Sequence, residues 1–383
     1  MPRWRSLLDS PLAAVLFVAA CYGILLTAYI RREGGDVSLL VTAGTNVDAR
    51  QAPRGLTVRS DVPGYDGVWF YRLASDPFST ATKTYGIQFD NPAYRRQRIL
   101  YPLLVHIASL GRVEWVPAML VAVNVAALLV LAFVAAQLSR HFGAHALWGV
   151  IAPLYPGFVT TISGDLSEIV QCMFLLSAIH AVQKRRSFIA AALLTCAVLT
   201  RETSIVLAAA LLVIYAYRFI RKRAQDYGAE TFAIPLAAYA AWQALIAWRF
   251  GTDTPLGSIA PKFSVPFAEY VRFLIANSSL RGISRLYFTE AAFLGAIVAI
   301  VIGAWRFAST KVTWRATWLA YLGLASTLPH NMWAEVSFVR VLADFFLIST
   351  VVILSSGRAA RIAALAATAV VWYFAASHLV KYG

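Results

Sequence analysis

The sequence predicts an all-α polytopic membrane protein, because it is too apolar for a soluble domain and its apolar runs are long enough to cross a bilayer. Of its 383 residues, 59% are hydrophobic and 14% are charged, whereas soluble domains carry about 25% charged residues. The mean hydropathy is +0.64. Runs of roughly 20 apolar residues recur as far as the C-terminus. This continuity favours one membrane-embedded domain over residues 1–383 rather than a series of soluble domains.

The first run follows a basic N-terminus and extends from about Pro11 to Ile30. A cleaved signal peptide loses its hydrophobicity at the cleavage site, but here apolar residues continue past the small-residue motif VAAC (Val18–Cys21). We therefore expect an uncleaved span with a cytoplasmic N-terminus. The polar stretch 31–98 predicts a long first loop, and residues 250–286 predict a second large loop.

Further apolar runs follow the first loop. The segment ILYPLLVHIASL (Ile99–Leu110) is short for a crossing, whereas the next run has full length. Additional spans are expected near 116–138, 146–162, 167–182, 188–199, 205–220, 231–248, 287–305, 316–333, 338–356 and 362–380.

The basic residues between the runs predict the topology. If Ile99–Leu110 lies at the membrane interface or re-enters without crossing, every basic connector faces the cytoplasm, as the positive-inside rule requires. If that segment crosses, every basic connector moves outside. The first arrangement gives about eleven spans in the plasma (inner) membrane, with the two large loops outside. The net charge of +15 is then a topology signal, and no nucleic-acid partner is expected. The connectors contain Arg140, Lys184–Arg186, Arg221–Arg223, Arg306, Lys311, Arg315, Arg358 and Arg361.

The first outer loop contains GYDGVWFY, in which Asp66 lies among aromatic residues. One interpretation is an Asx-turn residue between Gly64 and Gly67. The other is a general base, because partial desolvation raises a carboxyl pKa and favours proton abstraction from a hydroxyl. Aromatic faces such as those of Tyr65 and Trp69 also suit the apolar face of a sugar ring.

The motif NPAYRRQRILYPLL places Arg95, Arg96 and Arg98 just before an apolar stretch. Guanidinium groups there suit a phosphate, to which they donate parallel hydrogen bonds. The alternative is contact with lipid headgroups at the membrane surface. Tyr94 is expected to shape the turn into the membrane.

Two more outer segments carry charge. In SGDLSE, Asp165 and Glu168 lie three residues apart, either facing one site or capping a helix start. In LTRETS, Arg201 and Glu202 interrupt an apolar region without a loop to solvate them. Such charges usually face a water-filled cavity or a charged partner. A simple ion pair is the alternative.

The last outer segment, PHNMWAEVSFVR, ends at Arg340. This arginine either pairs with Asp344, four residues later, or closes the outer cavity with Glu335. The histidines and cysteines show no metal-ligand spacing, and there is no DxD pair or phosphate-binding glycine loop. We therefore expect no metal and no cofactor.

These residues resemble the GT-C superfamily of polytopic glycosyltransferases, which use polyprenyl-phosphate sugars and carry a catalytic carboxylate in a long first outer loop. Tyr65–Asp66 and Tyr101–Pro102–Leu103 are similar to motifs of the eukaryotic second mannosyltransferase of GPI-anchor synthesis (the GPI mannosyltransferase V type). The strings YDG and YRRQRILYPLL also resemble those of uncharacterised bacterial membrane proteins. A tyrosine stands where the mannosyltransferase has tryptophan, so sugar and acceptor stay open.

The resemblance implies inverting transfer of a sugar, with mannose expected first, from a polyprenyl-phosphate carrier to a hydroxyl of an envelope glycolipid, glycan or protein outside the membrane. Asp66 would be the general base. A transporter or flippase of a lipid-linked anion is the alternative. The donor phosphate would be held by members of the set Arg95, Arg96, Arg98, Arg201 and Arg340, and the substrates by Tyr65, Trp69, Tyr94, Asp165, Glu168, Glu202 and Glu335.

Overall fold

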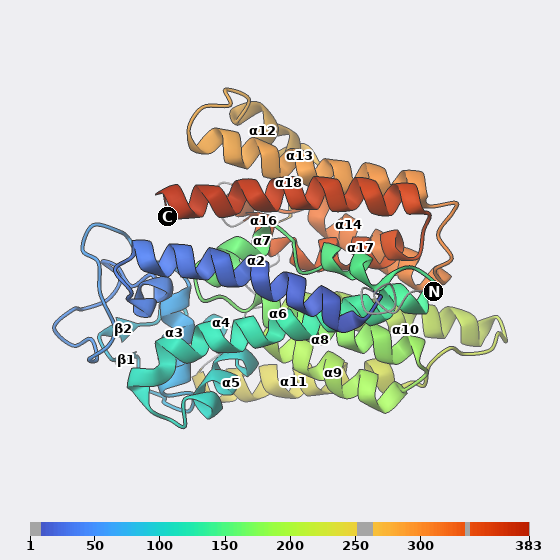
Figure 1. The fold of residues 1–383 in the computed structure, drawn as a ribbon. Coiled ribbons are helices and arrows are strands. Elements are labelled where there is room, and N and C mark those ends of the chain that lie inside the picture. Colours follow the sequence, from blue (N-terminus) through green and yellow to red (C-terminus); the bar gives the residue numbers. More distant parts are fainter. Residues whose placement is uncertain (1–8, 251–262, 334–337, 383) are drawn as a thin grey trace.

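Long helices that lie side by side make up most of the protein (Figure 1). The computed structural model describes residues 9–250, 263–333 and 338–382. Helices account for 71% of the described residues. The strands in the described ranges, β1 (Lys83–Thr84) and β2 (Ile87–Gln88), form one small antiparallel hairpin. The structure thus agrees with the predicted all-α class.

Six of the described helices are long and apolar enough to cross a membrane. Three shorter apolar helices accompany them: α8 (Glu168–Gln183), α9 (Ser187–Thr200) and α17 (Ala343–Leu354). This set of helices is that of an integral membrane protein. The six are α2 (Pro11–Arg32), α6 (Val116–His141) with the preceding turn η2 (Val113–Trp115), α10 (Ile205–Ile220) with the preceding turn η4 (Glu202–Ser204), α11 (Glu230–Phe250), α13 (Ile283–Ala304) and α18 (Arg358–Tyr382).

Shorter elements connect these helices. One of them, α5, has nine residues and is therefore about 14 Å long, well under the roughly 30 Å of a bilayer core. This length fits the prediction that Ile99–Leu110 does not cross. The connecting elements are η1 (Val37–Val41), α3 (Gly67–Ser75), α4 (Pro92–Arg96), α5 (Leu100–Ala108), η3 (Ala146–Ile151), α7 (Gly157–Ser163), α12 (Ala268–Ala276), α14 (Val312–Ser326), α15 (His330–Trp333) and α16 (Phe338–Val341).

Some predicted spans are not continuous helices. The run 146–162 is divided into η3 and α7, because Pro153 and Pro156 lie between them and proline has no amide hydrogen for a helix interior. The run 338–356 is likewise divided into α16 and α17. The number of crossings therefore stays a prediction.

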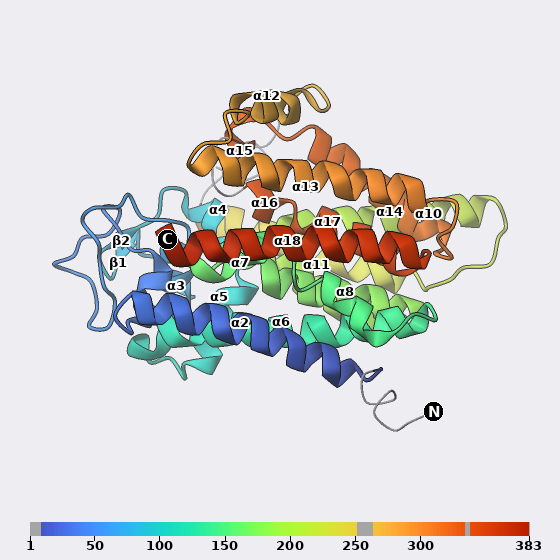
Figure 2. The ribbon, with the colours of Figure 1, turned by 45° about the horizontal axis from the view of Figure 1, so that its top comes forward.

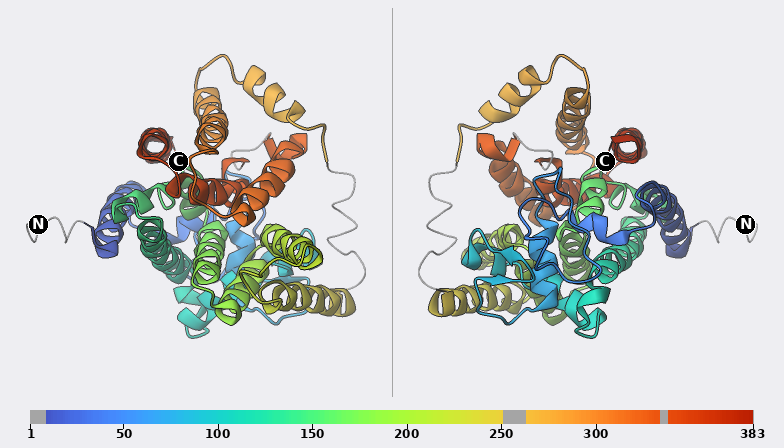
Figure 3. Two further views of the ribbon diagram at one scale, coloured as in Figure 1. Left: turned by 90° about the vertical axis from the view of Figure 1, so that its right-hand side faces the viewer. Right: turned by 90° about the vertical axis from the view of Figure 1, so that its left-hand side faces the viewer.

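The connectors gather at the two ends of the bundle as the charge pattern predicts. The basic connectors lie at the end where α2 begins, and the long first loop lies at the opposite end, where α18 finishes (Figure 1). Contacts join connectors distant in sequence: Ala146 donates to Asp9, and Ser309 donates to Ser355. Figure 3 shows the bundle along its long axis. The helix α12 packs against α13 on the outside of the bundle (Figure 2).

Charged side chains are buried at the end of the bundle that holds the first loop. An ionised group in a membrane domain is costly unless it is paired, and several of the buried charges here are paired. Glu168, Arg201 and Arg340 belong to one buried ion-pair network, and Arg98 pairs beside it with Glu202. This network positions the candidate site.

Candidate active site

Asp66 lies where the first loop enters α3 and packs tightly against the rest of the protein. A Cβ atom added to the next residue, Gly67, would lie 2.4 Å from the carbonyl oxygen of Gly164, so only glycine fits there. Asp66 is the residue before the helix, but its side chain caps no backbone amide. The interpretation of Asp66 as a turn residue alone is therefore wrong. Its carboxylate points to arginines instead.

Two arginines from distant segments bind the Asp66 carboxylate. Nη1 of Arg95, at the end of α4, donates to Oδ1 at 3.0 Å, and Nη2 of Arg340, in α16, donates to Oδ2 at 2.8 Å. The remaining nitrogens of Arg95 donate to both oxygens of Asp90, at 2.8 and 2.7 Å. Each oxygen of Asp66 thus has a guanidinium partner.

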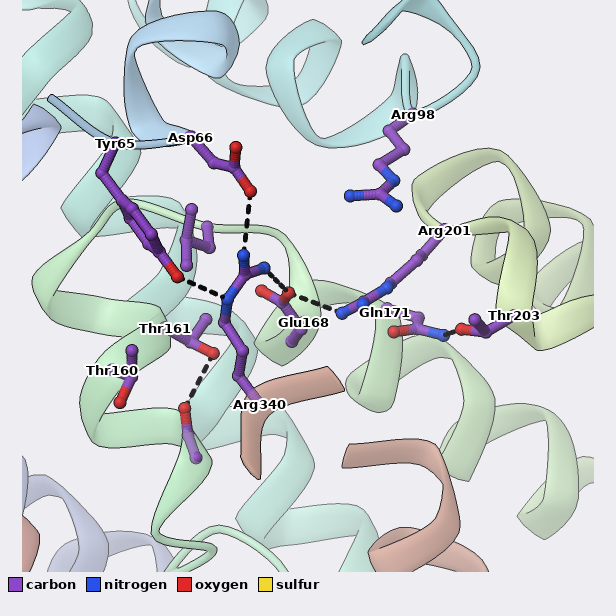
Figure 4. A network of polar contacts seen from close by, with 12 residues as sticks. Tyr65, Asp66, Arg98, Thr160, Thr161, Glu168, Gln171, Arg201, Thr203 and Arg340 are labelled. Carbon is purple, nitrogen blue, oxygen red and sulfur yellow. Dashed lines mark hydrogen bonds and ion pairs between the residues drawn. The ribbon is translucent and has the colours of Figure 1, made fainter. Parts of the chain in front are cut away.

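Arg340 is the centre of the network drawn in Figure 4. Besides Asp66, it donates from Nε to the hydroxyl of Tyr65 at 3.0 Å and from Nη1 to Oε1 of Glu168 at 2.6 Å. Arg201 donates to the same Glu168 oxygen at 2.5 Å. The predicted ion pairs of Arg201 with Glu202 and of Arg340 with Asp344 are not formed. Arg201 and Arg340 share Glu168.

A second pair lies beside this network. Arg98 donates from Nε and Nη2 to the two carboxylate oxygens of Glu202, at 2.9 and 2.5 Å, and Nη2 also donates to the hydroxyl of Tyr94 at 2.8 Å. Such two-point contacts fix a guanidinium in one orientation. In Figure 4 the side chains of Arg98 and Arg201 extend toward the space near Asp66 and Arg340.

That space is a cavity of about 490 Å³. Four arginines and four carboxylates line it, and so do apolar side chains of α14 and α17. The predicted site residues that line the cavity are Asp66, Tyr94, Arg95, Arg98, Arg201, Glu202 and Arg340.

The pKa of Asp66 moves opposite to the direction expected from the sequence. Burial raises this pKa, but the positive charges of Arg340, Arg95 and Arg98 outweigh burial, and the net pKa lies below the ordinary value of 3.8. The expectation of a raised pKa was wrong because it considered desolvation without the arginine partners. Asp66 is ionised and paired in this structure.

Three predicted site residues do not line the cavity but contact residues that do. Tyr65 and Glu168 hold Arg340, as described above. The ring of Trp69 lies 5.0 Å from the Arg95 guanidinium and 5.9 Å from Phe89. None of the three lines the cavity, so each positions a residue that does.

Two predicted residues lie elsewhere. Arg96 points away from the cavity: it donates to the carbonyls of Ser79 and Pro92 and lies over the rings of Phe89 and Phe250. Asp165 has a positive φ of 50° and is fully buried, with no hydrogen-bond partner among the described residues. Neither residue lines the cavity, so the structure does not bring them together with the other candidate donor- and substrate-binding residues. Glu335 lies outside the described residues.

Two carboxylates in the cavity wall were not assigned to the site from the sequence. Asp90 forms the two-point pair with Arg95, and its position five residues before that arginine was the available signal. Asp344 was assigned only as a partner of Arg340. Because α16 ends at Val341 and α17 begins at Ala343, the two residues do not share one helix face.

The described residues contain no group of three or more His, Cys, Asp or Glu side chains that could hold a metal ion. Metal independence stays a prediction. Comparison of the chain with protein-family models, with curated proteins and with solved structures gives no match.

Proposed function

We propose that the protein is a polyprenyl-phosphate-sugar-dependent glycosyltransferase of the GT-C type, whose catalytic carboxylate is Asp66. The observation that carries this proposal is the position of Asp66 in the wall of a cavity that is rich in arginine and adjoins an apolar pocket. The proposal includes about eleven spans and a site on the outer face of the plasma membrane.

The shape of the cavity favours an amphipathic substrate. An apolar pocket of about 140 Å³ lies next to it, and Ala325, Leu342 and Phe345 line both. Phe267 and residues of α12, α13, α14 and α15 form the rest of this pocket. A lipid-linked sugar phosphate has an isoprenoid chain for an apolar pocket and a charged, hydroxyl-rich end for a polar cavity.

The arginines of the cavity suit the phosphate of such a donor. Arg95 and Arg340 already hold the Asp66 carboxylate at ion-pair distance. A phosphate that approached them would compete with Asp66, because it offers the same kind of oxygen acceptor with more charge. Donor binding would then release part of the Asp66 carboxylate from its partners and raise its pKa toward a value that suits a general base.

The proposed chemical step gives each of these groups a role. Asp66 accepts the proton of an acceptor hydroxyl while that oxygen forms a bond to the anomeric carbon of the sugar. The bond between this carbon and the phosphate oxygen breaks, and polyprenyl phosphate leaves with the electron pair. Arg95, Arg98, Arg201 and Arg340 stabilise the negative charge on the leaving group. Attack from the face opposite the phosphate inverts the anomeric centre.

The test is transfer by purified protein in lipid nanodiscs. The donor is short-chain polyprenyl-phosphate mannose with a radiolabelled sugar, followed by the corresponding glucose and galactose donors, and the acceptor is a glycolipid extract of bacterial membranes. We expect labelled glycolipid and an equal amount of released polyprenyl phosphate. The proposal fails if no donor in this panel yields transfer while the protein moves labelled donor across proteoliposomes, which would identify a transporter instead.

A further inference from the structure

The cavity contains a carboxylate that the proposed reaction does not use. Asp344 is the second residue of α17, and its side chain lines the cavity although only 3% of the residue is exposed. It lies beside Tyr321 and Phe345 in the cavity wall.

Asp344 differs from the other three carboxylates that line the cavity. Asp66, Asp90 and Glu202 each bind an arginine at 3.0 Å or less. Asp344 has no arginine, lysine or histidine within ion-pair distance in the described part of the chain, and its Oδ2 has no hydrogen-bond partner there. Buried polar atoms without partners are uncommon and costly. This oxygen therefore has unused capacity to accept a hydrogen bond.

The surroundings of Asp344 make it a specific recognition group. Thr203, which also lines the cavity, and Gln171 are its polar neighbours, and Gln171 is held by bonds to Thr203 and Ser204, at 3.0 and 2.8 Å. Close packing leaves the buried Asp344 side chain little freedom to turn away.

The lack of an ion-pair partner selects the kind of group that Asp344 binds. No cation of the described residues forms an ion pair with it, and its carboxyl oxygens can accept hydrogen bonds from neutral hydroxyl groups. The four arginines of the cavity attract the phosphate. A ligand with one anionic group and several hydroxyls would therefore lie with its phosphate at the arginines and a hydroxyl at Asp344.

We propose that Asp344 binds a hydroxyl group of the sugar in the lipid-linked donor and so determines which sugars the site accepts. This inference rests on the proposed function. It assigns Asp344 to substrate recognition, separately from the proton transfer assigned to Asp66.

The test compares two ligands that differ only in the sugar. Binding of short-chain polyprenyl-phosphate mannose and of the same polyprenyl phosphate without sugar is measured by microscale thermophoresis for the wild type, Asp344→Asn and Asp344→Ala. Asp61→Asn, a change at a carboxylate with 78% side-chain exposure, is the matched control. We expect the wild type and the control to bind the mannose-bearing lipid more tightly. Loss of a hydrogen bond to a charged group should reduce this preference by about ten- to a hundredfold in both Asp344 variants, with binding of the bare lipid retained.

Several outcomes overturn the inference. One is an unchanged preference in Asp344→Asn and Asp344→Ala, and another is a wild type that does not discriminate between the two lipids. If Asp344→Ala is not monodisperse, Asp344→Asn decides alone, because asparagine keeps the shape of the side chain. Transfer is assayed separately. A wild type that discriminates but does not transfer would contradict the proposed function and leave sugar recognition by Asp344 in place.

Discussion

Arg340 donates one hydrogen bond to Asp66 at 2.8 Å and another to Glu168 at 2.6 Å, and so joins the first loop to the start of α8. Asp66 and Arg340 are 274 residues apart in sequence. The contact fixes one oxygen of the loop carboxylate at the cavity, and Arg95 binds the other. The stability of the site and its chemistry both depend on this arginine.

Replacement of Arg340 by Ala should destabilise the protein strongly. Its side chain is 6% exposed and has two carboxylate partners, and removal of one partner from a buried ion pair costs about 3–5 kcal/mol. Lysine keeps the charge but cannot donate in three fixed directions, so Arg340→Lys should be intermediate. The measurement is thermal unfolding in detergent, monitored by fluorescence-detected size exclusion. Equal melting temperatures for wild type and Arg340→Ala would show that the network does not stabilise the fold.

The pH dependence of transfer follows from the lowered pKa of Asp66. The pKa of Asp66 in the folded protein lies below 3.8. The ionised carboxylate therefore stabilises the fold above pH 3.8, and this stabilisation is lost as the pH falls through the pKa of the folded protein. Since kcat/KM reports the free enzyme, it should show no acid limb above about pH 4. An acid limb between pH 5 and pH 7 that disappears in Asp66→Asn would contradict the depressed pKa.

Arg96 and Arg98 should differ in their effect on turnover. Arg98 lines the cavity, whereas Arg96 donates to backbone carbonyls and lies against aromatic rings. Loss of a charge-assisted bond to the donor phosphate in Arg98→Ala should reduce kcat/KM by about ten- to a hundredfold. Arg96→Ala should change kcat/KM by less than about threefold, when rates are normalised to monodisperse protein. A larger loss in Arg96→Ala than in Arg98→Ala would reverse the assignment.

The sidedness of the site can be tested by labelling. The native cysteines are first replaced, and one new cysteine is then placed at Thr80 or at Lys184, which are both exposed. The two positions should react oppositely with a membrane-impermeant thiol reagent on intact cells. The native cysteines are Cys21, Cys172 and Cys196. Position 80 should react and position 184 should react only after permeabilisation, because the positive-inside rule places the basic connector in the cytoplasm. The reverse pattern would move Asp66 to the cytoplasmic side.

The sequence predicted the helical class, the grouping of the basic connectors and most of the charged residues that meet at the cavity. These features follow from hydropathy and from the bias of Lys and Arg, which are readable along one chain. The orientation of neighbouring arginines was harder to infer. Successive helix residues point about 100° apart, so Arg95 faces Asp66 while Arg96 faces Phe89 and Phe250.

The partners and the resulting pKa values could not be predicted, because they join segments far apart in sequence. Asp66 meets an arginine 29 residues away and another 274 residues away. The separation of Arg340 from Asp344 depends on a helix break at Leu342, which hydropathy does not reveal. The sequence therefore indicated the charged residues of the site but not their pairing.

The most direct measurement of the central claim is the initial rate of sugar transfer by Asp66→Asn. The fold should persist, because Arg340 keeps its bonds to Glu168 and Tyr65 and Arg95 keeps both bonds to Asp90. Asparagine has nearly the same size but cannot accept the proton of the acceptor hydroxyl, and removal of a general base typically lowers the rate by about 10²–10⁴. Rates are compared with wild type and with Asp61→Asn, with donor binding and monodispersity measured on the same samples. The account predicts that Asp66→Asn binds donor and transfers at most about a hundredth of the wild-type rate, whereas a variant that kept about a tenth or more of that rate would contradict the catalytic role of Asp66.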